Sequence, residues 1–346
     1  MSRLLPKPTK VGIPRSASLL LMGVAVLLAA CGGAPAPAPA PAAQKLKVVL
    51  LAQGMTNDGA WNQSAADAVK RLEREGRIEA TIRERNNDPA AIESVVRDYA
   101  TRGYNLVITN GYEAIEPVLK LAKEFPKVHF AINGGTEVLQ MTAPNVEGWT
   151  LDLQQWGYLC GFVAARIGGV RMVGLVSGPQ IPFIEEIHTA FKAGLKDTDP
   201  SRTWKEAYTG SFDDTQKAKE AAEALIGQGA QLLFTTGDGI GYGVGVAAAG
   251  HQPKVLTIGV AGGTAKQVNI LNVKVDDYPE YKSYVDRIEA GTFGSKAYTA
   301  TFPNKGLVLT PPEEGATDPR IPADLRAQID KLIADLASGA RTISTP

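Results

Sequence analysis

The chain has 346 residues, enough for two domains of ordinary size, and it carries 36 basic and 36 acidic side chains. This balance indicates neither a nucleic-acid partner nor an acidic tail. The first 30 residues contain four basic side chains and no acid, so the rest of the chain has a net charge of −4.

The N-terminal 30 residues have the three parts of a secretory signal. A basic segment ends near Arg15, an apolar segment runs to Ala30, and small residues precede the expected cleavage site. The apolar segment is shorter than the roughly 20 residues that a permanent membrane helix needs. The sequence LAAC, ending at Cys31, resembles the lipobox of bacterial lipoproteins, although an ordinary signal with a chance cysteine is the alternative. We therefore predict a lipoprotein signal over residues 1–30 and lipidation of Cys31, which anchors the protein to the membrane on its periplasmic or outer side.

Residues 32–44, GGAPAPAPAPAAQ, alternate alanine and proline after the cysteine. Such a composition favours an extended spacer without a core, so residues 31–45 are predicted to be a lipidated linker. The other cysteine, Cys160, lies in the apolar helical pattern YLCGFVAARI, and no disulfide is expected.

Short β-branched runs alternate with helical patterns from Lys45 onward, which is typical of βαβ units and parallel sheets. The predicted strands are Leu46–Leu51, Ile78–Arg83, Leu106–Thr109, Val128–Asn133, Val146–Thr150, Met172–Val176, Trp204–Tyr208, Leu232–Thr235, Leu256–Val260 and Val268–Val275. The predicted helices include Pro89–Arg102, Ile115–Glu124, Leu153–Ile167, Thr215–Gly227, Pro279–Gly291 and Pro322–Leu336.

The second half of the chain repeats the first. GYNLVITNGYEAI, from Gly103, matches GAQLLFTTGDGIG, from Gly229, and VVLLAQG matches MVGLVSG upstream of them in the same order. We therefore predict two similar three-layer α/β lobes around a ligand cleft. The N-terminal lobe is expected over residues 46–150 and about 278–305, and the C-terminal lobe over residues 151–277 and about 306–346.

Ligands of open α/β sheets bind at the carboxyl ends of the strands. The loops at those ends carry four aromatic side chains, Trp61, Tyr112, Phe183 and Phe212, with Trp61 predicted to lie in the turn between the first strand and the next helix. One such aromatic, taken alone, is better explained as a cap on its own core. Four at one edge favour a cleft in which a flat apolar ligand stacks.

Several motifs in order identify a family. The lipobox, NDGAWNQ, YNLVITNGYEAIEPVLKLAKEFPKVHFAI, GYLCGFVAARIGG, VGLVSGPQIPFIEEIHTAFKAGL and GSFDDTQKAKEAAEALIGQGAQLLF together resemble the basic membrane protein family. These are purine-nucleoside-binding lipoproteins that supply ABC transporters. The resemblance covers about residues 50 to 300. It implies a type I periplasmic-binding-protein fold that closes on its ligand, with a permease and an ATPase as partners.

The resemblance also implies where the ligand lies. A base stacks between two aromatic positions of the family, which are Trp61 and Phe212 here. Gln53 and Asn57 are the polar candidates from the first loop. The ribose side differs, because Ala261 stands where nucleoside-binding members have an aspartate, and the family's lysine in the next strand is assigned to the position of Asp276. We therefore predict a purine base or similar ring with little or no sugar, with Asp238 and Asp276 as acceptors for its N–H groups.

Local structural roles are also open for the aspartates at positions 238 and 277. Asp238 is as well explained by a turn that bonds its own backbone. Asp277 is predicted to start the helix that has Pro279 in its first turn.

Other chemistries are poorly supported by the sequence. GDGIGYGVG lacks the spacing of a dinucleotide fingerprint, no nucleophile motif is present, and the three histidines lie far apart in sequence. Glu185, Glu186 and His188 occupy one helical turn and are predicted to form a solvated face. We expect a monomer without cofactor, metal or catalytic activity. A ligand sensor for a membrane receptor, or a binder of another small solute such as a sugar, remains open.

Overall fold

A computed structural model describes residues 45–237, 239–259, 266–310 and 313–344. The predicted signal, Cys31, the linker before Lys45, Asp238 and Ala261 lie outside the described residues. Within the part that is described, no helix combines the length and apolar character needed to cross a bilayer.

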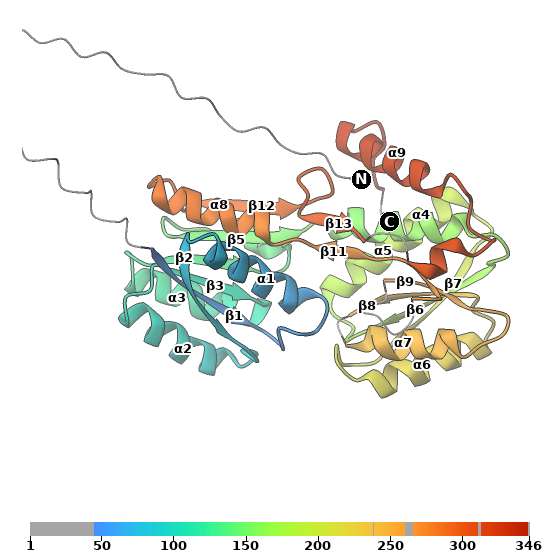
Figure 1. The fold of residues 1–346 in the computed structure, drawn as a ribbon, viewed down its shortest axis with the longest axis horizontal. Helices are drawn as coiled ribbons and strands as arrows, with labels where there is room; N and C mark the ends of the chain where they lie inside the picture. The colour runs from blue at the N-terminus through green and yellow to red at the C-terminus, as the bar shows by residue number, and fades with distance from the viewer. Residues whose placement is uncertain (1–44, 238, 260–265, 311–312, 345–346) are drawn as a thin grey trace, which may run out of the picture. The chain divides into compact units, whose positions relative to one another are not determined.

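The first sheet has six parallel strands in the order β12-β5-β4-β3-β1-β2. Its strands are β1 (Leu46–Ala52), β2 (Ile78–Arg83), β3 (Leu106–Asn110), β4 (His129–Asn133), β5 (Val146–Leu151) and β12 (Lys296–Ala300). One apolar cluster joins the sheet to α2 (Pro89–Thr101) and α3 (Ile115–Glu124). A second joins the opposite face to α1 (Trp61–Arg74) and α8 (Tyr278–Glu289), so the sheet lies between two helical layers (Figure 1).

The second sheet has five parallel strands in the order β10-β9-β8-β6-β7. Its strands are β6 (Met172–Ser177), β7 (Thr203–Tyr208), β8 (Leu232–Thr236), β9 (Leu256–Ile258) and β10 (Asn269–Leu271). On one face lie α6 (Thr215–Gly227) and α7 (Ile240–Ala249). On the other lie α4 (Leu153–Arg166), α5 (Pro182–Thr198) and α9 (Leu325–Ser338). Cys160 is fully buried on α4 as a free thiol.

The strand orders confirm the predicted duplication and the α/β fold class. The order β4-β3-β1-β2 in the first sheet is matched by β9-β8-β6-β7 in the second, with each strand in the corresponding place along the chain. The short 3-10 helices are η1 (Tyr112–Ala114), η2 (Thr136–Gln140) and η4 (Glu314–Thr317). The exact limits of the two lobes stay a prediction.

The predicted strand Val268–Val275 is wrong as a single element. It divides at Asn272 into β10 and β11 (Val273–Val275). The first part pairs in parallel with β9, whereas β11 pairs antiparallel with β13 (Leu307–Leu309). The apolar run is continuous in sequence, but the chain leaves the second sheet in the middle of it. This change of partner places β11 and the start of α8 where the chain returns to the first sheet.

Candidate functional site

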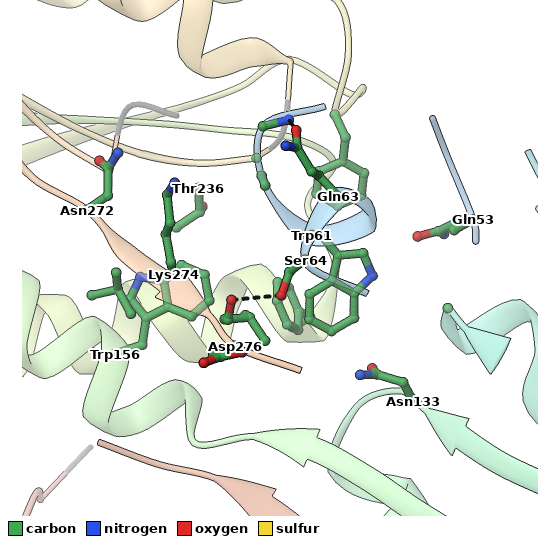
Figure 2. A pocket seen from close by; sticks show the side chains of 18 of the residues that line it. Gln53, Trp61, Gln63, Ser64, Asn133, Trp156, Thr236, Asn272, Lys274 and Asp276 are labelled. Carbon is green, nitrogen blue, oxygen red and sulfur yellow. Dashed lines mark hydrogen bonds between the residues drawn. The ribbon is translucent and has the colours of Figure 1, made fainter. Parts of the chain in front are cut away.

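A pocket of about 650 Å³ opens at the carboxyl ends of strands from both sheets (Figure 2). That volume lies in the range of small-molecule sites, roughly 300–1,000 Å³. Its walls include residues that follow β1, β3, β4, β8 and β9, together with the starts of α1 and α5 and the strand β11. The position agrees with the general rule that open α/β sheets bind ligands beyond their strand ends.

The polar residues around Trp61 hold it in place. The prediction of a loop position is wrong by a small margin, because Trp61 is the first residue of α1. Asp58 accepts hydrogen bonds from the backbone N–H groups of Ala60, Asn62 and Gln63, which satisfies donors that a helix start leaves free. The Asn62 side chain in turn accepts from the backbone of Gly54. The NDGAWNQ motif is therefore a cap that fixes the position of the indole.

Two of the predicted aromatics are supported by neighbouring backbone or rings. The Trp61 ring centroid lies 5.8 Å from that of the buried Trp149, at an interplanar angle of 37°. Phe212 lies against Gly178, where an added Cβ would come within 2.7 Å of the Phe212 ring. A side chain at position 178 would therefore displace that wall of the pocket.

The structure brings six of the predicted site residues to the pocket wall, namely Gln53, Trp61, Tyr112, Phe183, Phe212 and Asp276. Asn57 is exposed in the turn that precedes α1 and does not line the pocket. Asp238 lies outside the described residues. Tyr112 is 53% exposed, so its ring is the least enclosed of the aromatics. Ligand contact by each of these residues stays a prediction.

Sequence reasoning missed several pocket residues, among them Trp156, Asn133 and Lys274 (Figure 2). Trp156 lies on α4, whose apolar pattern gave no sign that this ring reaches the pocket. Lys274 lies on β11 and lines the pocket two residues before Asp276. The inference that this strand lacks a pocket lysine is therefore wrong. The error arose because the continuous run Val268–Val275 concealed where β11 begins.

Two buried amides lie next to each other at the end of the first sheet. Asn110 on β3 and Asn133 on β4 stand in register, and each is 2% exposed. Among the described residues, neither side-chain amide has a hydrogen-bond partner at its oxygen or its nitrogen. Asn133 lines the pocket, whereas Asn110 does not. A buried unpaired amide is unfavourable by about 1–3 kcal/mol, so Asn133 is suited to a ligand that supplies the missing donor and acceptor.

The capping bond at the start of α8 comes from Asp276 and not from Asp277. Asp277 stands at the N-cap position of α8, as predicted, but its side chain makes no capping bond. Asp276 accepts from the backbone N–H of Tyr278 instead, 3.1 Å away, so part of its carboxylate is already engaged. Burial raises the pKa of Asp277 to about 7; the Ser64 hydroxyl opposes this shift, and the charge of Asp276 adds to it.

Asp277 should make stability depend on pH. Its folded pKa is above the usual value of an aspartate, so between about pH 4 and 7 the folded protein binds a proton that the unfolded chain releases. The free energy of unfolding should therefore fall as pH rises through this window, by up to about 1.4 kcal/mol per pH unit. Asp277→Asn should remove this contribution. Urea denaturation at pH 4.5, 6 and 7.5 measures the difference, and parallel profiles for the two proteins would contradict it.

The prediction of a solvated face around His188 is wrong. The His188 side chain is fully buried, and its ring contacts Ser177 and Glu206, which come from two different strands. The helical spacing gave no sign of these partners, because both lie elsewhere in the sequence. In the described part of the chain, no cluster of three or more histidine, cysteine, aspartate or glutamate side chains is placed to hold a metal ion.

Comparisons with known proteins agree with this fold and pocket. A family model described as ABC transporter substrate-binding protein PnrA-like matches residues 45–266. The solved structure of an ABC transporter solute-binding protein from Conexibacter woesei is 44% identical, with a TM-score of 0.76, and the match covers 87% of this chain and 99% of that one.

Two curated relatives are more distant. A purine-binding protein of Brucella abortus is 26% identical, over 73% of this chain and 71% of its own length. The ABC transporter nucleoside-binding protein BmpA of Lactococcus lactis is also 26% identical, but the chain spans only 57% of that relative. The family match covers more than half of the chain and includes both predicted stacking positions. The chain belongs to the PnrA-like family of ABC transporter substrate-binding proteins.

Proposed function

We propose that this solute-binding protein captures a purine-type base, in preference to a nucleoside, and delivers it to an ABC importer. Proteins of its family bind solutes for transporters and are not enzymes. The observation that carries the proposal is the buried, unpaired amide of Asn133 in a pocket lined by Trp61 and Phe212. An aromatic wall suits a flat ring, and a neutral amide suits the mixed donors and acceptors of a heterocycle edge.

The neutral character of the amide narrows the ligand class. A carboxamide offers one acceptor oxygen and two donor hydrogens, which complement a ring nitrogen beside an N–H or amino group. Thr235 adds a second buried polar group to the pocket wall, and its hydroxyl has no partner among the described residues. The names of the two curated relatives, purine-binding and nucleoside-binding, fall in the same ligand class.

The preference for a base over a nucleoside rests on one position. The sequence has Ala261 where the resemblance implies an aspartate that accepts ribose hydroxyls. An alanine cannot accept those bonds, and a buried unpaired hydroxyl is unfavourable by about 1–3 kcal/mol. Because Lys274 lines the pocket, the absence of a lysine no longer supports the preference, and Ala261 carries it by itself.

Calorimetric titration tests the preference. Adenine, guanine and xanthine should each be compared with the corresponding nucleoside, with ligand carried through purification first removed by unfolding and refolding. We expect at least one base to bind about tenfold or more tightly than its nucleoside, given an unpaired hydroxyl worth about 1–3 kcal/mol. Binding of nucleosides alone would refute the preference, and an Ala261→Asp variant should shift the ratio toward the nucleoside.

We also propose that Cys31 is the lipid-anchored residue. The proposal rests on the LAAC sequence and on the Ala-Pro spacer that follows it. Cys31→Ala should prevent acylation and release the protein from the membrane fraction, since stable anchoring depends on the attached acyl chains. Fractionation followed by mass spectrometry of the N-terminal peptide measures this. Cys160→Ala is the matched control, because that buried thiol should leave the anchor unchanged.

A further inference from the structure

A chain of hydrogen bonds runs through the second lobe to the pocket wall. The Glu206 carboxylate lies 2.9 Å from His188 Nδ1, and His188 Nε2 lies 2.6 Å from the Ser177 hydroxyl. The Ser177 hydroxyl lies 2.7 Å from that of Thr236. Ser177 and His188 are fully buried, whereas Thr236 is 4% exposed and lines the pocket. Of these four residues, only Thr236 therefore reaches a ligand in the pocket.

The acidic end fixes the direction of the first bond. The Lys192 ammonium lies 2.8 Å from the Glu206 carboxylate, which favours the ionised form of this carboxylate, and an ionised carboxylate can only accept. His188 Nδ1 must therefore carry a hydrogen. The Tyr208 hydroxyl, 3.3 Å from the same nitrogen, donates its own hydrogen to Glu185, so its oxygen can also only accept from His188. Both neighbours of Nδ1 require the same tautomer.

The charge around His188 favours a neutral ring. The Lys192 ammonium lies 2.8 Å from Glu206 and already balances its charge. Glu185, the other carboxylate of this cluster, accepts from Tyr208 and does not contact the ring. A cation on the fully buried imidazole would therefore contact no carboxylate other than the one that Lys192 already balances, and burying such a charge is unfavourable. A neutral ring with hydrogen on Nδ1 has a bare Nε2, which can only accept.

The remaining bonds then have one arrangement. Ser177 must donate its hydrogen to Nε2, so its oxygen accepts the hydrogen of Thr236. The Thr236 hydroxyl thus uses its hydrogen inside the protein. Its remaining lone pairs are the only hydrogen-bonding capacity that it can offer to a ligand.

We propose that Thr236 is a specificity residue that Ser177, His188 and Glu206 orient as a hydrogen-bond acceptor for a ligand N–H or amino group. This rests on the proposed function, since it assigns one polar contact within the same pocket. The serine, histidine and acid follow the order of a hydrolytic triad, but the fully buried Ser177 does not line the pocket and cannot reach a ligand. The chain of bonds sets the polarity of Thr236, and Ser177, His188 and Glu206 are positioning residues.

Ligand pairs that differ by one amino group test the polarity. Adenine against purine and guanine against hypoxanthine should be titrated into the wild type, Thr236→Val, Thr236→Ser and Ser177→Ala. We expect the wild type to prefer the amino-bearing member of at least one pair. Thr236→Val should lower that preference by roughly threefold to tenfold, the usual size of one net hydrogen bond, and Thr236→Ser should restore it. Ser177→Ala should also lower it, because the freed hydroxyl can then donate.

Thr235→Val is the matched control within the same pocket. Thr235 lines the pocket beside Thr236, but its hydroxyl does not contact Ser177. The effect of Thr235→Val on affinity should add to that of Ser177→Ala, whereas the effects of Thr236→Val and Ser177→Ala on affinity should be non-additive. The proposal would be overturned if the wild type binds bases and the Thr236→Val and Ser177→Ala variants keep its preferences. It would also be overturned if Ser177→Ala were additive with Thr236→Val as well as with Thr235→Val. Either result would leave the proposed function intact.

A second measurement needs no ligand. Nitrogen-15 NMR of the histidine rings, assigned with a His188→Gln variant, should show a neutral ring protonated on Nδ1 at pH 7. A ring protonated on Nε2, or on both nitrogens, would overturn the proposal. If the wild type binds no purine base, the proposed function fails, and this spectrum still decides the polarity of Thr236.

Discussion

Trp61→Ala is expected to weaken binding of the preferred base by roughly one to two orders of magnitude. Stacking of a base on an aromatic side chain contributes about 1–3 kcal/mol, and the indole lies at the pocket wall. The cap built on Asp58 holds the indole in place in the free protein, so little conformational entropy is lost when the ligand binds. Calorimetric titration of the wild type and the variant with the same base measures the change.

Two controls separate stacking from loss of stability. Trp61→Phe keeps an aromatic face and should retain affinity within a few-fold of the wild type. Trp204→Ala removes a partly buried tryptophan from β7, away from the pocket, and should leave affinity unchanged. Because Trp61 also contacts Trp149, the thermal midpoint of Trp61→Ala is expected to fall. Undiminished affinity in a folded Trp61→Ala protein would show that this ring only covers the core.

Asn133→Leu should affect affinity and stability in opposite directions. Leucine is close to asparagine in size but has no polar atom, so a ligand group that meets it is left unpaired. We expect the affinity for the base to fall roughly tenfold to a hundredfold, as for a buried polar group without a partner. The same change removes an unpaired buried amide, so the free energy of unfolding of the empty protein should rise by about 1–3 kcal/mol.

Asn110→Leu is the matched control, because Asn110 stands beside Asn133 with the same burial and equally unpaired atoms but does not line the pocket. It should raise stability in the same way while leaving affinity near that of the wild type. Urea denaturation without ligand and calorimetry with ligand give the two quantities. Equal losses of affinity in both variants would mean that the two strands are disturbed in general. A fall in stability for both would mean that these amides support the fold.

The repeated order of strands and helices was predictable from the sequence. Buried parallel strands are continuous β-branched runs separated by helical patterns, so Leu106–Asn110 and Leu232–Thr236 could be recognised as equivalent before their sheets were known. The aromatic residues of the site could also be found, because Trp61, Phe183 and Phe212 occur after strands, where apolar residues are unusual. Local pattern and position within a βαβ unit were enough for both inferences.

Side chains whose role depends on distant partners could be assigned only from the tertiary structure. Trp156 lies within an apolar helix, and Asn133 ends a strand like many polar residues, so neither differs locally from a residue without a ligand role. The division of β10 from β11 depends on which strand each part pairs with, and Lys274 was missed for this reason.

The chain of hydrogen bonds that ends at Thr236 is the clearest example of an arrangement that the sequence did not predict. Ser177, His188 and Glu206 come from a strand, a helix and another strand, and nothing in their spacing predicts that they touch. Sequence alone determined the fold class, the duplication and the aromatic character of the site, because these follow from local hydrophobic pattern. Tertiary structure decided which polar atoms are buried, which of them lack partners and which direction a hydroxyl donates, because hydrogen bonds depend on distances between segments far apart in the chain.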